Sequence, residues 1–387
     1  MNASGFIASR LKFQGKLAVA AVAVSFLVII VSISISSGFR HTIRDGVASI
    51  AGDITIVRNS SSSTLEDDPI VSELPSRSDI AGLPGVVSIR PVVQRPAIIR
   101  SGGVIHGVMV KGVEGRADTL SGVSIPSRLA SLTGLSAGDE MITYFVGERL
   151  KVRKFRVLDV YSDNIAPDEN LIVYAPIEAM RRVQGWGPDE ASALEVELHP
   201  SFRIAGAMEG LRQRVGAILA GSPHPEENIL LASSSRTRYP QLFDWLSLLD
   251  FNVLAILLLM TAVAGFNMVS GLLIVLLRNI STIGILKTLG MTDRAIAKVF
   301  LKVSSGVVLK GILIGAGTAL GLCLIQMFTH VVKLNPANYY VSFVPVHIDL
   351  PFILVATLIA YAVIMLILLL PTLYISRIDP ASTVRSL

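Results

Sequence analysis

The hydrophobic positions of this chain gather into four uncharged runs, each about as long as a membrane span. The runs are Leu17–Phe39, Phe251–Leu277, Gly311–Thr329 and Leu350–Ser376. Crossing about 30 Å of hydrocarbon takes about 20 residues of α-helix, whereas the apolar stretch of a buried core helix is only about 10–14 residues long. The pattern therefore predicts a membrane protein with four transmembrane helices.

The first run follows Arg10, Lys12 and Lys16, so a cleaved signal peptide is the alternative to a membrane anchor. The apolar part of a signal peptide is about 7–15 residues long, which is shorter than this run. We therefore expect an uncleaved anchor. Ahead of it the sequence predicts an amphipathic helix over residues 1–16 on the inner membrane surface, with an ordinary basic flank as the alternative. Its apolar positions are Phe6, Ile7, Leu11 and Phe13.

The charges predict the orientation of the spans. The first 16 residues hold three cations and no acid, which places the N-terminus in the cytoplasm, and four crossings return the C-terminus there. The wide gap, residues 40–250, then lies outside the cytoplasm. The predicted spans are residues 17–39, 251–277, 303–329 and 351–376, joined by a cytoplasmic loop 278–302, a short outer loop 330–350 and a cytoplasmic tail 377–387.

Charge and composition support this division. Hydrophobic residues make up 51% of the chain and charged residues 16%. The gap at residues 40–250 holds 22 Lys and Arg against 26 Asp and Glu, so the net charge of +5 comes from the membrane segments and their cytoplasmic flanks. The high isoelectric point is therefore a sign of membrane orientation, and we expect no nucleic-acid partner.

The outer domain is predicted to have an α+β fold. It contains no cysteine, since Cys323 lies in the third run, so it folds without disulfides. Alternation and Val/Ile enrichment predict strands at 53–57, 86–89, 97–100, 104–111, 141–145, 151–160, 171–173 and 194–198. Helices are expected at 127–135, at 176–184 with Pro176 as its first residue, and at 202–219. Residues 59–69 read as a polar loop.

The segment Arg278–Lys302 is the most informative stretch. It carries five cations against one acid, Asp293, as expected for a short cytoplasmic loop. Within it, the apolar stretch Ile283–Leu289 stops at Gly290, the residue type that commonly follows a helix end. A short, partly apolar helix in the cytoplasm predicts a docking surface for a partner protein.

Catalytic patterns are missing from the sequence. There is no G-x-x-x-x-G-K-[ST] phosphate loop, so the chain does not hydrolyse ATP alone, and no G-x-S-x-G elbow. The six histidines show no metal-ligand spacing. Acidic pairs such as Asp189–Glu190 fit solvated surface. We therefore predict a non-catalytic chain without metal or cofactor of its own, rather than an enzyme on a membrane anchor.

The third run contains two small-residue patterns, Gly311–Gly315 and Gly317–Gly321, which allow close helix packing either within the subunit or at a dimer seam. Aromatic residues precede the second and fourth spans and predict belts at the outer membrane interface. They are Phe243, Trp245 and Phe251 before the second span, and Tyr339, Tyr340 and Phe343 before the fourth.

Several short motifs occur in a characteristic order. They are FIASR at 6–10, SGFR at 37–40, GVEG at 112–115, LTGLSAGDE at 132–140, AGFNMVS at 264–270, IGILKTLG at 283–290 and IDPA at 378–381. Together with the arrangement of the spans, they resemble the FtsX-like permease superfamily, the membrane subunits of force-transmitting ABC transporters. Within it the chain is most similar to the LolC/LolE lipoprotein-releasing permeases. One departure is Thr282, which stands where the family usually has an acid.

The resemblance implies that Thr282–Gly290 is a coupling helix that docks on a separate cytoplasmic ATPase dimer, which binds the ATP and Mg²⁺. Ile283, Ile285, Leu286 and Leu289 would supply apolar contacts and Lys287 a polar one. The alternative is that these side chains pack on the permease's own helix ends. Asp379 would cap a final helix that begins at Pro380 and makes a second cytoplasmic contact.

The resemblance further implies a multi-pass protein of the Gram-negative inner membrane with a periplasmic outer domain. It would pair with a second permease subunit, either the same chain or a paralogue, and extract lipoproteins from the outer leaflet for a periplasmic chaperone. Asn164 and Pro167, in the polar loop 162–170, are candidates for the chaperone contact. Peptide or drug efflux and activation of a cell-wall hydrolase are the alternatives. Candidates for an acyl-chain cavity are Val31, Ile33, Ile35 and Phe39 on the first span, and Phe251, Val253, Leu254 and Leu257 on the second.

Overall fold

The computed structural model describes residues 16–59, 68–101, 104–115, 121–147, 150–161, 171–335 and 339–374. All but Lys16 of the interfacial helix expected at 1–16 lies outside the described residues, as do most of the loop 59–69, the loop 162–170 and the tail 377–387. The chain divides into two units. The helical unit comprises residues 1–40, 246–333 and 343–387, and the sheet unit comprises 41–245 and 334–342.

The helices that carry the four apolar runs are long and apolar enough to cross a membrane. They are α2 (Lys16–Ala51), α9 (Pro240–Arg278), α11 (Asp293–Thr329), and α13 (Leu350–Ile367) with α14 (Leu369–Tyr374). The first three extend past the runs that they contain. The fourth is interrupted at Leu368, three residues before Pro371, whose ring nitrogen cannot donate the next helical hydrogen bond.

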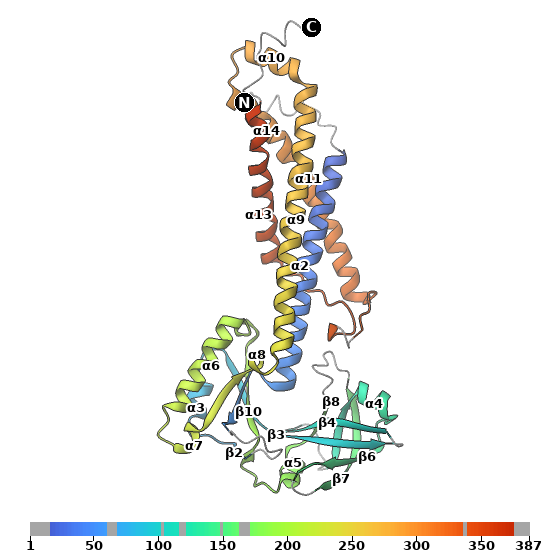
Figure 1. Cartoon of the computed structure of the whole chain (residues 1–387), viewed down its shortest axis with the longest axis vertical. Helices are drawn as coiled ribbons and strands as arrows, with labels where there is room; N and C mark the ends of the chain where they lie inside the picture. Colours follow the sequence, from blue (N-terminus) through green and yellow to red (C-terminus); the bar gives the residue numbers. More distant parts are fainter. Residues whose placement is uncertain are drawn as a thin grey trace. The chain divides into compact units, whose positions relative to one another are not determined.

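These helices lie alongside one another in the helical unit (Figure 1). One buried apolar cluster joins all four at the end that includes α10 (Ile280–Thr288), and it is built around Phe26, Met268, Phe300 and Ile364. A second cluster joins them further along α2, around Ile29, Ile33, Ala319 and Ile353. The small-residue pattern Gly311–Gly315 allows α11 to approach α2 closely. A side chain on Gly315 would meet the backbone oxygen of Ala23 at 2.4 Å.

The sheet unit contains a nine-stranded sheet in the order β11-β1-β10-β3-β4-β8-β5-β7-β6. Its strands are β1 (Ile54–Arg58), β3 (Val86–Ser101), β4 (Val104–Val113), β5 (Gly122–Pro126), β6 (Glu140–Phe145), β7 (Lys151–Tyr161), β8 (Leu171–Pro176), β10 (Ala193–Leu198) and β11 (Leu230–Ser234). A separate short pair is formed by β2 (Ile70–Val71) and β9 (Glu190–Ala191).

The long strand β3 divides this sheet into two halves. Residues 86–92 pair with β10, whereas residues 93–101 pair with β4. Because β3 also pairs with β6, the strands from β3 through β4 to β6 close into a barrel. The barrel encloses a core that includes Ile99, Val110, Ile125 and Phe145. The other half, β11-β1-β10-β3, is antiparallel and packs around Ile56, Leu194 and Val215.

Short helices complete the sheet unit. The barrel half carries α4 (Ser127–Thr133) and α5 (Ile177–Gln184), and the other half carries α3 (Arg77–Ala81), α6 (Ala205–Ala220) and α7 (Pro225–Asn228), while α8 (Ser235–Arg238) precedes α9. The predicted strands and helices are confirmed with some differences. The helix expected at 202–219 begins at Ala205, and the short elements α3, α7, α8, β2 and β9 were not predicted. The strands expected at 86–89 and 97–100 are one strand, Pro176 is the N-cap of α5 rather than its first residue, and β5 and β11 were not predicted.

Candidate functional site

The coupling segment forms a short helix with a well-defined end. Helix α10 is bounded by Asn279 and by Leu289, and Gly290 follows with a φ of 87°. The amide of Gly290 donates to the oxygen of Lys287 (3.0 Å), and that of Met291 donates to the oxygen of Leu286 (3.0 Å). These two bonds form a Schellman motif, in which glycine adopts the left-handed conformation without steric cost. The helix stop predicted at Gly290 is confirmed.

The two faces of α10 have different surroundings. Ile283 is buried, and Leu286 is partly buried against the same cluster as Phe300 and Ile364. On the other face Thr282 is exposed, Ile285 is 49% exposed and Leu289 is 78% exposed. Positions 282, 285 and 289 follow helical spacing, so they share one side of the helix. We call Thr282, Ile285 and Leu289 the docking face, after the docking that the sequence predicts for this segment.

Lys287 makes an internal contact. Its ammonium nitrogen lies 2.9 Å from Oδ1 of Asp293, and only 10% of its side chain is exposed. Asp293 is the first residue of α11, where a negative charge interacts favourably with the helix N-terminus. The ion pair therefore holds α10 against the start of the next helix. The contact between Lys287 and a partner stays a prediction.

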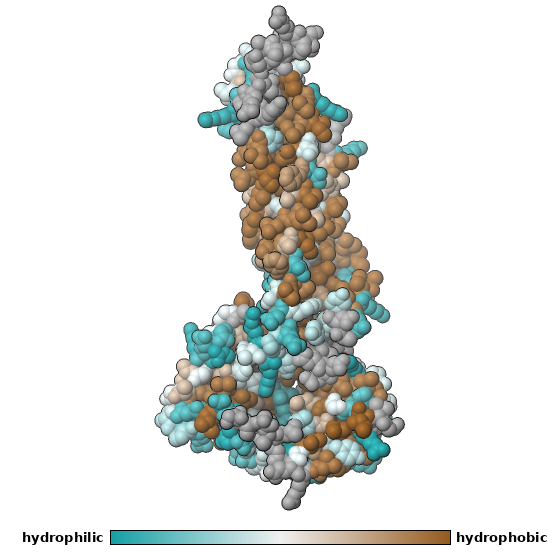
Figure 2. Space-filling model, in the orientation of Figure 1, coloured by the Kyte–Doolittle hydropathy of each residue, from teal (hydrophilic) through white to brown (hydrophobic). Residues whose placement is uncertain are grey.

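The cations of this segment lie on its surface. Arg294, Lys298 and Lys302 are exposed at intervals of four residues along α11, and Arg278 is exposed at the end of α9. Figure 2 shows hydrophilic residues at this end of the helical unit, next to a surface that is mostly hydrophobic. Exposed cations beside an apolar span agree with the predicted cytoplasmic location of this loop, which stays a prediction.

The residues predicted to line an acyl-chain cavity fall into a buried group and an exposed group. Val31, Val253 and Leu257 pack together in one apolar cluster, in which Ile33 is fully buried. Phe39 is also buried and Ile35 is half-buried. By contrast, Phe251 is 67% exposed and Leu254 is 53% exposed on α9. The structure thus buries or half-buries the α2 residues and leaves two residues of α9 exposed.

A polar contact at this level was not predicted from the sequence. Arg40 of α2 and Asp250 of α9 form an ion pair, and the Ser36 hydroxyl donates to the same carboxylate oxygen at 3.0 Å. The only signal in the sequence is that an opposite charge borders each of the two apolar runs. The pair links α2 to α9 within the helical unit.

The two glycine patterns of α11 have different roles. Gly311 and Gly315 face α2, because a side chain on Gly311 would meet Val22 at 2.6 Å. At Gly317 and Gly321, a side chain would meet no described atom within 4 Å. Packing inside the subunit therefore accounts for the first pattern but not for the second.

The remaining predicted residues cannot be placed. Asp379, Asn164 and Pro167 lie outside the described residues. Within the described part of the chain, no cluster of three or more His, Cys, Asp or Glu side chains could hold a metal ion.

Two protein-family models match this chain. The MacB-like periplasmic core domain matches residues 17–214, and the FtsX-like permease C-terminal domain matches residues 254–380. The lipoprotein-releasing system transmembrane protein LolC of Xylella fastidiosa is 23% identical over 411 residues, covering 99% of this chain and 95% of that protein. LolC of Neisseria meningitidis serogroup B is 22% identical and covers 97% and 94%. The solved periplasmic region of MacB from Actinobacillus actinomycetemcomitans is 14% identical, covers 49% of this chain and 91% of that one, and gives a TM-score of 0.31.

Proposed function

Since the chain belongs to the FtsX-like permease family of ABC transporters and carries a MacB-like periplasmic core domain, we propose that it couples ATP hydrolysis by a separate cytoplasmic ATPase to the release of lipoproteins from the inner membrane. The observation that carries the coupling role is the docking face of α10. Ile285 and Leu289 expose large apolar side chains on a helix flanked by exposed cations.

The cargo follows from the relatives rather than from the geometry. The curated relatives named LolC match nearly the whole chain and are called lipoprotein-releasing. In this proposal, lipoprotein acyl chains contact Phe251 and Leu254, which α9 exposes. A second permease subunit completes the cavity, the ATPase dimer binds ATP and Mg²⁺, and the loop 162–170 with Asn164 and Pro167 contacts a periplasmic chaperone.

Movement is passed on in three steps. ATP binding closes the ATPase dimer, α10 moves with it, and the spans carry the shift to the sheet unit. Helix α2 supports the last step because it is helical without interruption from Lys16 to Ala51. Asp379 in the cytoplasmic tail supplies a second contact with the ATPase.

The test uses the permease with its cognate ATPase in nanodiscs loaded with a triacylated lipoprotein. ATP-dependent transfer of the lipoprotein to a soluble periplasmic chaperone is the expected result. Leu289→Asp should abolish transfer and ATPase binding, whereas Leu289→Met, which keeps an apolar side chain there, should retain both. ATP hydrolysis without transfer and without stimulation by lipoprotein would instead favour efflux or signalling to a cell-wall hydrolase.

A further inference from the structure

The last turn of α2 is tied to the sheet by a buried lysine. Lys111 of β4 is only 3% exposed at its side chain, and its ammonium group donates to Oε2 of Glu195 (2.7 Å) and to the backbone oxygen of Ile50 (2.5 Å). Ile50 is the penultimate residue of α2, so its carbonyl is one of the four that a helix end leaves without an intrahelical partner. A cation there also interacts favourably with the helix dipole.

The pair joins three elements at one point. Lys111 stands on β4 in the barrel half, and Glu195 stands on β10 in the antiparallel half. Between them, Gln94 of β3 donates to the other oxygen of Glu195 at 3.3 Å. Gly52, directly after α2, has a φ of 68°, and a side chain there would lie 2.9 Å from the Glu195 Cβ. The helix therefore ends in close contact with Glu195.

A second group of charges holds the same part of α2. Arg203 lies 2.7 Å from Oδ1 of Asp45 in α2 and 3.1 Å from Oδ1 of Asp53 just beyond it. Asp53 also accepts the amide hydrogen of Leu198 at 2.7 Å. Burial raises the pKa of Asp53 despite these hydrogen bonds. Arg203 and the Leu198 amide thus hold Asp45 and Asp53, near and just after the end of α2, against the rest of the sheet unit.

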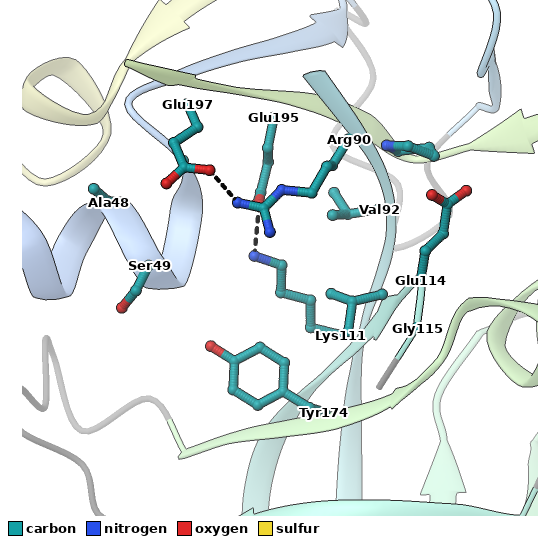
Figure 3. A pocket seen from close by; sticks show the side chains of 13 residues that line it. Ala48, Ser49, Arg90, Val92, Lys111, Glu114, Gly115, Tyr174, Glu195 and Glu197 are labelled. Carbon is teal, nitrogen blue, oxygen red and sulfur yellow. Dashed lines mark hydrogen bonds and ion pairs between the residues drawn. The ribbon is translucent and has the colours of Figure 1, made fainter. Parts of the chain in front are cut away.

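Val47 and Ala51 of α2 are buried at this joint, but the packing there is incomplete. A cavity of about 290 Å³ lies between Ala48, Ser49 and Gly52 on one side and strands β3, β4, β8 and β10 on the other. Figure 3 shows Lys111 reaching Glu195 beside this cavity. Burial lowers the pKa of Lys111, so a charge at this position is by itself unfavourable. Because apolar residues in place of a buried ion pair are often equally stable, stability alone does not account for the pair.

Resting on the function proposed above, we propose that Lys111, Glu195 and the Ile50 carbonyl form the joint through which α2 moves both halves of the sheet unit. From the barrel half, Lys111 holds the helix end through the Ile50 carbonyl and the antiparallel half through Glu195. A shift of the helix end then acts on β4 and β10 where the two halves meet and changes the distance between the halves, instead of being absorbed in the cavity.

The test replaces both charges at once, Lys111→Met with Glu195→Gln, so that no buried charge is left unpaired. The matched control is Lys154→Met with Glu140→Gln, which removes an exposed ion pair between β7 and β6. Both are made in a Cys323→Ser background with spin labels at Leu158 and Leu231, two exposed positions in the two halves. The complex with its ATPase is studied in nanodiscs, with and without ATP and vanadate.

We expect nucleotide trapping to change the distance between the labels in the parent and in the control. In the double variant we expect no change, at least a tenfold slower lipoprotein transfer, and ATP hydrolysis within twofold of the parent. Lys111→Arg, with Glu195 intact, keeps the charge and the hydrogen-bond donors. We expect this variant to retain the distance change, which would show that the site tolerates substitution.

A distance change in the double variant equal to that of the parent would overturn the joint and leave the proposed function standing. No distance change in the parent would also overturn it, since there would be no movement to pass on. A distance change that depends on Lys111, without any transfer of lipoprotein, would support the joint and contradict the proposed cargo.

Discussion

Ile285 and Leu286 are neighbours in the chain but face opposite surroundings, the first half exposed and the second packed into the core of the helical unit. Ile285→Asp should therefore weaken ATPase binding roughly 10- to 100-fold, since burying such a side chain contributes about 1.5–3 kcal/mol. Affinity for the isolated ATPase, measured with the permease in nanodiscs, checks this.

Leu286→Asp provides the contrast. A carboxylate placed against this apolar cluster costs several kcal/mol unless it is paired, so this variant should reduce the thermal stability of the permease itself. Equal loss of ATPase affinity in both variants, with unchanged thermal stability in both, would contradict the two faces assigned to α10.

Gly290 offers a prediction about backbone strain. Its φ of 87° is unfavourable for residues with a side chain, and no described atom would lie within 4 Å of an added Cβ. Gly290→Ala should destabilise the end of α10 by about 1 kcal/mol through conformation alone, and Gly290→Asn by less, because Asn tolerates the left-handed region. Hydrogen exchange of the Gly290 and Met291 amides in the parent, and of the corresponding amides in the variants, measures the effect. Equal exchange in Ala and Asn variants would exclude strain as the cause.

The glycines of α11 can be separated experimentally. Gly315→Ala forces a carbon against the Ala23 backbone and should destabilise the helical unit by about 1–3 kcal/mol. Gly317→Ala meets no described atom and should be neutral or stabilise by up to about 1 kcal/mol. Thermal unfolding in detergent compares them. If Gly317→Ala instead dissociates a permease dimer in native mass spectrometry, the second glycine pattern forms an intersubunit seam.

Glu227 predicts how acid affects the sheet unit. It is fully buried, and burial by itself raises the pKa of its carboxyl, but hydrogen bonds from Ser222 and from the amide and hydroxyl of Ser76 outweigh this and hold the pKa below 4.5. Between the folded pKa and 4.5, the unfolded chain binds more protons than the folded chain. The stabilisation is therefore present above pH 4.5 and is lost as the pH falls through the folded value.

Glu227→Gln should remove this contribution to the pH dependence. The measurement is urea unfolding of the full chain in nanodiscs between about pH 3 and 6, followed by hydrogen exchange in α7 and at Ser76. Glu226→Gln, at the exposed neighbouring position, is the matched control. If the free energy of unfolding of Glu227→Gln changed with pH as steeply as that of the parent, the role assigned to the Glu227 carboxyl would be contradicted.

The features that depend on neighbouring residues could be predicted from the sequence alone. Apolar runs, strand alternation and Gly290 as a helix stop are properties of short segments, and these elements are present in the structure. The exception within a single element is β3. Pro91 and Pro96 indicate a break, because proline cannot donate a ladder hydrogen bond. The strand continues because Pro91 lies next to the change of partner from β10 to β4, and Pro96 directly precedes the residues that pair with β6.

Contacts between distant residues were decided only by the tertiary structure. Lys111 and Glu195 lie 84 positions apart, and Arg40 and Asp250 lie 210 apart. Opposite charges border the two apolar runs at Arg40 and Asp250, but neighbouring residues do not show that the two pair, because ion pairing depends on which strands or helices become neighbours. The same holds for α10 and α11. Hydrophobic spacing predicts that each helix has an apolar side, but only packing shows that Leu286 is covered while Leu289 is exposed, and that Gly315 meets α2 while Gly317 does not.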